Sequence, residues 1–396
     1  MTGVWASVWV TTAIQVLCAL AIYAPPVLAP VAQAEVGLSA SSVGVVMSLV
    51  FAAATCAALL SGTPIARYGA LRVSQGSLLL CGAGLALMVS ANAWVIALGA
   101  IVIGLGYGVV TPSSSSILTD RVPRGLRAFV FSLKQTGVPI GGALAGALLP
   151  AGMLAFGWRG AALAAAVACG LLALGIQPWR ERWESPRHAR QPGSRQSFIA
   201  PLALVFRSPR LRELALASFS YSGMQNCLAA YLVVDLHERI GFSVSAAGLS
   251  LSAAMGAGIA GRILWGVVAD RVVAPRRLLG LLGFGMSLAS LFTAAITPSW
   301  PTGAVLALSV AFGVTAVGWN GVYLAELAHA VASRDSAAAT GAALALTYAG
   351  IVTLPLLFWG IVLASGSYAA SYAAVGCVTL WRSARLFRSV RHAVVE

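Results

Sequence analysis

Two basic residues stand inside long apolar stretches of the chain, where charged side chains are rare. Lys134, the only lysine, and Arg262 are both surrounded by apolar and small residues. A cation that faced lipid there would cost several kcal/mol, so each should face the protein interior or a water-filled cavity. We expect both to bind a substrate carboxylate, which ammonium and guanidinium groups recognise through charge-assisted hydrogen bonds. The alternatives are that these long side chains reach the inner headgroups or cap the carbonyls of a broken helix.

Acidic residues that could balance these cations are scarce within the apolar stretches. Glu326, near the end of the stretch 301–328, is the one acid that could be drawn inward beside Arg262 or Lys134. It is therefore the candidate for proton coupling, and an interfacial charge at a helix end is the alternative. Two interior cations with at most one nearby acid predict an electropositive cavity that favours an anionic substrate.

Uncharged polar and aromatic residues within the apolar stretches would set the selectivity of such a cavity. Amides and aromatic rings also join helices to one another, which is the alternative for each of them. Gln135 follows Lys134 directly and should lie on a different face of its helix, so we do not include it. We expect Pro25 and Pro26 to break the first helix just beyond Tyr23. The candidates for substrate binding besides the two cations are Gln15, Tyr23, Tyr107, Tyr221, Gln225, Asn226, Trp319 and Asn320.

The elements that position these residues are membrane spans. Of the 396 residues, 59% are hydrophobic and only 9% are charged, which is too few charges for the surface of a soluble domain. Soluble enzymes and nucleic-acid-binding proteins are therefore excluded. Apolar runs of about 20 residues, enough to cross a hydrocarbon core of about 30 Å, recur along the whole chain. They predict an all-α integral membrane protein with twelve transmembrane helices, at residues 6–33, 42–62, 73–91, 93–117, 128–152, 160–177, 213–234, 243–268, 278–297, 301–328, 337–364 and 366–381.

A basic stretch divides the predicted spans into two blocks of six. The stretch, residues 178–212, would be a cytoplasmic linker between the bundles 1–177 and 213–396, the second ending in a short cytoplasmic tail. If both termini lie in the cytoplasm, 21 of the 25 basic residues fall on the inner side, and only Arg159 and Arg239 lie in outer loops. We therefore expect a multi-pass protein of the bacterial inner membrane, with both termini cytoplasmic.

The two halves repeat one loop pattern. The loop after the second span begins at Gly62 and continues to Arg67 and Gly69, and the loop after the eighth span begins at Gly266 and continues to Asp270 and Arg271. The two copies start 204 residues apart (from 62 to 266) and follow the second helix of their half. A repeat of whole six-helix units is typical of transporters whose substrate site lies between pseudo-symmetric bundles.

These loops resemble the motif of the major facilitator superfamily, which reads glycine, three residues, an acid, arginine, any residue, glycine, then basic residues. The resemblance covers the whole chain and implies two bundles that work by alternating access. In that family the acid and its basic partners brace the cytoplasmic side of the outward-facing state. The second copy keeps Asp270 but has Val273 in place of the glycine, and the first copy has Ala66 in place of the acid. We expect a gating role for Asp270 and Arg271, with Gly266, Arg67 and Gly62 as the other motif positions; topology anchoring is the alternative for the arginines.

Two spans add a more specific resemblance. The fifth, from Phe131 through Lys134 to Gly142, resembles that of cyanate-permease-like organic-anion carriers and partly resembles the antiporter signature of drug exporters. Its glycines let a neighbouring helix approach closely, and packing is the simpler reason for them. The eighth, with Arg262 four residues before Gly266, resembles the helix of monocarboxylate and oxalate–formate carriers in which an arginine binds substrate carboxylate. The aspartate that precedes this arginine by one turn in monocarboxylate carriers is replaced by Gly258.

These observations predict a secondary active transporter of a small organic anion, a monocarboxylate above all, driven by proton symport or anion exchange. A proton-coupled drug or multidrug exporter is the alternative, but an exporter of cations needs a mid-membrane carboxylate in the first half, and the sequence offers none. A transporter-like sensor would need an added soluble domain. The sequence contains no catalytic triad, metal cluster or phosphate-binding loop, so we expect no enzymatic activity and no cofactor or metal. The expected partners are an anionic small molecule, protons and the lipid bilayer, without nucleic acid, and the expected state is a monomer.

Overall fold

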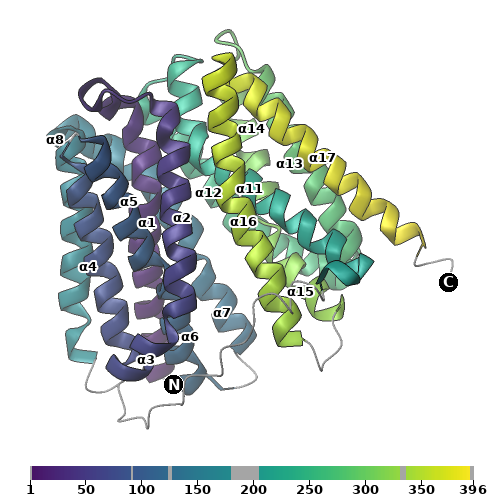
Figure 1. Ribbon diagram of the computed structural model, residues 1–396, viewed down its shortest axis with the longest axis horizontal. Helices are drawn as coiled ribbons and strands as arrows, with labels where there is room; N and C mark the ends of the chain where they lie inside the picture. The colour runs from purple at the N-terminus through teal and green to yellow at the C-terminus, as the bar shows by residue number, and fades with distance from the viewer. Residues whose placement is uncertain (1, 91, 124–126, 180–204, 331–335, 393–396) are drawn as a thin grey trace. The chain divides into compact units, whose positions relative to one another are not determined.

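The protein is helical throughout the part that the computed structural model describes, which comprises residues 2–90, 92–123, 127–179, 205–330 and 336–392 (Figure 1). Strands are absent from these ranges. Most of the expected linker, residues 180–204, and the loop arginines Arg124 and Arg334 lie outside the described residues.

The contacts within the chain divide it into two compact units, residues 1–194 and 195–396. The first unit consists of α1 (Thr2–Val36), the short 3-10 helix η1 (Ala40–Ser42), α2 (Val43–Leu60), α3 (Gly62–Tyr68), α4 (Ala70–Met88), α5 (Ala93–Gly108), α6 (Val110–Arg121), α7 (Arg127–Gln135) and α8 (Gly137–Gly175). The second unit consists of α11 (Pro209–Glu238), α12 (Val244–Arg271), α13 (Pro275–Ala295), α14 (Thr302–Ala316), α15 (Asn320–Ala330), α16 (Ser336–Ser365) and α17 (Tyr368–His392).

The helices account for the twelve predicted spans. Within the described residues, nine helical segments are long and apolar enough to cross a membrane. The longest, Leu133–Trp179, contains a sharp turn at Gly157, whose φ of +71° favours glycine, so it supplies both the fifth and the sixth span. α11 and α17 occupy the places of the seventh and twelfth spans, but they carry too many polar residues to be among the nine.

Three of the spans are interrupted where candidate residues lie. α5 gives way to α6 at Val109, and α7 gives way to α8 at Thr136. Each break comes three residues before a proline, Pro112 or Pro139, which has no N–H to offer the carbonyl four residues earlier. The third break, residues 317–319, separates α14 from α15. Discontinuous helices of this kind leave backbone groups available for ligands or side chains in membrane transporters.

The predicted break of the first helix is wrong. α1 runs without interruption from Thr2 to Val36 with Pro25, Pro26 and Pro30 inside it. Pro25 and Pro26 are buried, and α1 packs along α8. Neighbouring helices in a membrane bundle can hold a proline-containing segment in helical form although backbone hydrogen bonds are lost.

Glycines create the same close helix contacts in both units. Gly141 of α8 lies so near the carbonyl of Val16 on α1 that a side chain there would collide with it, which confirms the packing interpretation of this glycine. Gly350 of α16 meets the carbonyl of Phe219 on α11 in the same way. The second pair follows the first by 203 residues on one helix (from 16 to 219) and by 209 on the other (from 141 to 350). Both offsets lie within five residues of the loop repeat of 204 residues, so the two units share this helix contact.

Candidate substrate-binding sites

Lys134 is buried among neutral oxygen atoms. Its side chain is only 1% exposed, so it does not reach the surface, which excludes the headgroup alternative for this residue. The Nζ atom donates to Gln15 Oε1 at 2.6 Å, to Thr111 Oγ1 at 3.3 Å and to Gln135 Oε1 at 3.4 Å. These partners come from α1, α6 and the end of α7. Among the described side chains none is an acid paired with Lys134, so the ammonium charge is surrounded by dipoles alone.

Gln15 leaves a hydrogen-bond donor unused beside this charge. Its side chain is fully buried, and because Oε1 accepts from Lys134, the amide orientation is fixed. The Nε2 atom then has no partner among the described residues. A buried unsatisfied donor costs about 1–3 kcal/mol. An ammonium group and an amide N–H₂ group side by side, without an acid, match the two oxygens of a carboxylate.

The neighbours of Lys134 include one residue that the sequence interpretation left out. Lys134 is buried and Gln135 is exposed, so the two side chains face different ways as expected, yet Gln135 Oε1 accepts from Lys134 Nζ at 3.4 Å. Thr111 was also missed, although it stands directly before Pro112 at the break between α5 and α6.

The aromatic candidates of the first unit lie further along its helices. Tyr23 is buried in α1, eight residues or roughly 12 Å beyond Gln15. Tyr107 is half-buried in the last turn of α5 and packs edge-on against Phe51 of α2, with ring centroids 6.2 Å apart. Both residues make further polar, electrostatic or ring contacts.

Three candidates of the second unit form one hydrogen-bonded group. Gln225 Oε1, on α11, accepts from Trp319 Nε1 at 3.1 Å and from Asn320 Nδ2 at 3.2 Å. Trp319 is fully buried in the break between α14 and α15, and its ring meets those of Tyr221 and Tyr323 edge-on at 5.6 and 5.4 Å. Because both bonds use the amide oxygen of Gln225, its orientation is fixed with the amide nitrogen directed elsewhere.

Tyr221 and Asn226 are engaged in joining helices. The Tyr221 hydroxyl donates to the Leu279 carbonyl at 3.1 Å and lies 3.0 Å from Ser383 Oγ. The Asn226 amide donates to the Ile351 carbonyl at 3.1 Å. These bonds tie α11 to α13, α17 and α16, which is the helix-joining alternative for amides and aromatic hydroxyls.

Arg262 sits at the break after α14. Its side chain is half-buried, and Nε donates to the carbonyl of Val317 at 3.1 Å, where α14 ends. One turn later on α12, Trp265 Nε1 donates to the carbonyl of Val314 at 2.8 Å. Arg262 therefore caps a broken helix, which is one of the alternatives expected for it.

Glu326 belongs to a charged group at the end of the second unit that is expected to be cytoplasmic. Its side chain is only 5% exposed and pairs with Arg210 at 2.9 Å and Arg276 at 3.5 Å. Of the two alternatives for Glu326, an inward position beside Arg262 or Lys134 and an interfacial charge at a helix end, its described partners on α11 and α13 favour the second. The sequence did not predict its pairing with Arg210 and Arg276.

The motif residues lie at the ends of helices. Asp270 and Arg271 are exposed in the last turn of α12. Gly266 lies in the same helix, one turn earlier. In the first copy of the motif, Gly62 begins α3 and the Arg67 guanidinium lies 5.2 Å from the ring centroid of Tyr68.

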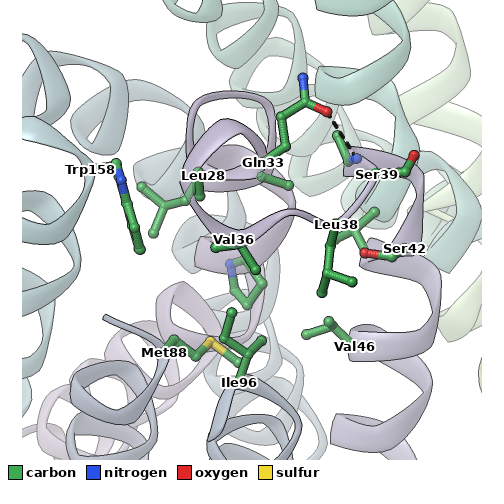
Figure 2. A pocket seen from close by; sticks show the side chains of 15 residues that line it. Leu28, Gln33, Val36, Leu38, Ser39, Ser42, Val46, Met88, Ile96 and Trp158 are labelled. Carbon is green, nitrogen blue, oxygen red and sulfur yellow. Dashed lines mark hydrogen bonds between the residues drawn. The ribbon is translucent and has the colours of Figure 1, made fainter. Parts of the chain in front are cut away.

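A separate apolar pocket lies near the last turns of α1 in the first unit (Figure 2). Leu28, Val36, Met88, Ile96 and Trp158 are among its lining side chains, and the only polar bond drawn within it runs from the Ala40 N–H to Gln33 Oε1 at 3.1 Å. No charged residue lines this pocket, so it offers nothing to an anion. No signal in the sequence pointed to it.

Three comparisons with known proteins agree with this architecture. Residues 11–355 match the sequence model of a family described as the Major Facilitator Superfamily. The chain is similar to the 3-(3-hydroxy-phenyl)propionate transporter of Escherichia coli (strain K12), with 30% identity over 311 residues, which are 76% of this chain and 72% of that protein. It is 31% identical to the gentisate transporter of Corynebacterium glutamicum over 115 residues, which are 29% of this chain and 26% of that protein.

Among solved structures, a nucleoside transporter matches with a TM-score of 0.78 at 14% identity and covers 98% of both chains. At this level of identity the likeness shows a common fold.

Proposed function

Since the chain belongs to the Major Facilitator Superfamily, whose members are transporters and not enzymes, we propose that it carries a small organic anion across the bacterial inner membrane by alternating access. The two relatives are named for 3-(3-hydroxy-phenyl)propionate and gentisate, both hydroxylated aromatic acids with one carboxylate. We therefore propose an aromatic monocarboxylate as the substrate.

The observation that carries this proposal is the pairing of Lys134 with the unused amide donor of Gln15. A substrate carboxylate accepts from Lys134 Nζ through one oxygen and from Gln15 Nε2 through the other. It supplies the negative charge that the described surroundings of the ammonium group lack, and it satisfies the buried amide. An aliphatic or aromatic cation would gain neither interaction and would be repelled by Lys134, so this site disfavours cationic drugs.

Further candidates in the second unit remain part of the proposal. Arg262 is proposed for its permanent charge at the break between α14 and α15, where its Nε caps the carbonyl of Val317. Gln225 and Asn320, held by the bond between them and by Trp319, present amide groups suited to hydroxyl groups. Asp270 and Arg271 are proposed to take part in gating, as the motif implies.

The energy source is proposed to be either a proton gradient or anion exchange. Glu326 is paired with Arg210 and Arg276 and is the candidate for proton coupling in the first case. Anion exchange needs no titrating residue, because one substrate carboxylate replaces another beside Lys134.

Uptake of radiolabelled carboxylates into proteoliposomes tests both parts of the proposal. The parent protein should take up 3-(3-hydroxyphenyl)propionate or gentisate, and Lys134→Ala should lose this uptake, with Arg262→Ala measured in parallel. Anion binding that survives both substitutions unchanged would sink the anion site. Uptake accelerated by anion inside the vesicles, but not by a pH gradient, would assign exchange; the reverse result would assign proton symport and return Glu326 to consideration.

A further inference from the structure

The exposed face of the last helix, α17, changes from apolar to aromatic and basic residues toward its C-terminal end. α17 buries Thr379, Ser383 and Leu386 against its own unit. Its opposite face exposes Cys377 and Val378, then Trp381, which is 49% exposed, and finally Arg385. An apolar surface followed within two turns by tryptophan and arginine is typical of a helix that leaves the hydrocarbon core and enters the headgroup layer.

Two guanidinium groups share the ring of Trp381. The Cζ atom of Arg382 lies 4.2 Å from a ring centroid of this indole, and that of Arg385 lies 4.6 Å away. Cation–π contacts of this length hold both groups against one ring although they repel each other. The ring therefore keeps two positive charges together at the surface of the helix.

The donors of these two arginines are not used by any residue that the structure describes. In the part of the chain that the structure describes, neither Arg382 nor Arg385 forms a hydrogen bond or an ion pair. Glu213 of α11 attracts Arg382 electrostatically without pairing with it. A cation–π contact in the first unit differs, because Arg159, whose Cζ atom lies 4.7 Å from the Trp158 ring centroid, is paired with Glu35 and donates to the Val89 carbonyl at 3.1 Å.

The charge of this region also lacks compensation. The expected cytoplasmic ends of the second unit carry exposed or half-buried cations in excess over acids; the described ones are Arg207, Arg210, Arg212, Arg271, Arg276, Arg277, Arg382 and Arg385, against Glu213, Asp270 and Glu326. Guanidinium groups bind phosphate through two parallel hydrogen bonds, and each arginine near an anionic leaflet contributes about 1 kcal/mol to lipid attraction.

We propose that Trp381, Arg382 and Arg385 form a binding site for the phosphate group of an anionic phospholipid in the inner leaflet. The acyl chains lie along the apolar face that begins at Val378, the glycerol region contacts the indole, and the two guanidinium groups bind the phosphate. The lipid anchors the end of α17, which packs on α13 through Phe387 and Phe284. This site is independent of the transported substrate.

Native mass spectrometry and thermal unfolding of the full-length protein in detergent test the proposal. Phosphatidylglycerol should bind to the parent and raise its unfolding temperature. The double variant Arg382→Gln/Arg385→Gln should bind it roughly 30-fold more weakly, about fivefold for each arginine, and lose the thermal shift. The matched control Arg212→Gln/Arg277→Gln removes the same charge from exposed positions and should keep both responses.

Other outcomes overturn the proposal. Equal loss in the control pair would mean that net charge alone attracts the lipid. Equal affinity for phosphatidylcholine would remove the preference for an anionic headgroup, and equal competition by soluble glycerol phosphate would remove the role of the acyl chains and of Trp381. A variant that unfolds before lipid is added is replaced by Trp381→Leu, which keeps the charge and should still weaken binding by removing the ring that holds both arginines together.

Discussion

The replacement Lys134→Met separates a binding role from a structural one. Methionine keeps an unbranched side chain as far as the ε carbon and lacks the ammonium group, whose bonds to Gln15, Thr111 and Gln135 measure 2.6, 3.3 and 3.4 Å. The side chain is 1% exposed, so no solvent replaces these interactions.

The expected effect on binding follows from the lost charge-assisted bond to the substrate. Hydrogen bonds to charged groups contribute about 1.5–3 kcal/mol, so the Kd for an aromatic carboxylate should rise about 10- to 150-fold. Stability should fall less than binding, since the removal of a buried charge that has no described acidic partner offsets the cost of leaving Gln15 Oε1 without its donor. The signature is therefore a loss of anion binding that is larger than the loss of stability.

Isothermal titration calorimetry with 3-(3-hydroxyphenyl)propionate or gentisate, alongside thermal unfolding, measures both quantities. Arg159→Gln serves as a control, because this exposed cation is paired with Glu35 at the other end of the first unit and should leave binding unchanged. An unchanged Kd in Lys134→Met, or a drop in stability as large as the drop in binding, would refute the reasoning and leave Lys134 as a structural residue.

Three further pairs of substitutions test separate contacts. Gln15→Glu places a carboxylate beside the ammonium group, so competition should reduce anion binding more than Gln15→Ala does in the same titration. Glu326→Gln removes the acid that pairs with the largely buried Arg276 and should cost about 3–5 kcal/mol in denaturant unfolding. Arg210→Gln should cost less than about 1 kcal/mol, because the Arg210 side chain is itself 53% exposed and Glu326 keeps Arg276 as a partner; equal costs would contradict the burial argument. Gly313→Ala drives a methyl group into a carbonyl of α12 and should lower the unfolding temperature by several degrees, while Gly303→Ala, which meets nothing, should not.

Much of the fold could be predicted because lipid and water accept different residue types. Hydropathy marks where a helix must cross lipid, and arginine counts mark loops, so the spans and halves could be found without any contact information. The helix breaks were harder, since they depend on competition for carbonyl groups. Pro112 and Pro139 interrupt their helices, but Pro25 and Pro26 do not, although the local chemistry is the same.

The site was predictable residue by residue but not as a contact. Lys134 and Gln15 were both found because they are polar within apolar runs, yet 119 positions separate them and nothing in the sequence says that they touch. Glu326 illustrates the same limit. The scarcity of acids within the spans made Arg262 or Lys134 a possible partner, whereas the partners in the structure are Arg210 and Arg276.

The polarity of α11 has a consequence for how the second unit reaches the membrane. This helix is buried along most of its length and is not among the helices apolar enough to span alone. A nascent segment with glutamine, asparagine and tyrosine at its centre partitions poorly from the translocon into lipid. Its insertion must then wait for helices synthesised later, above all α16 and α17, which shield its polar groups once they arrive. Truncation of the gene after α13 should therefore leave α11 outside the bilayer, although its own codons are intact.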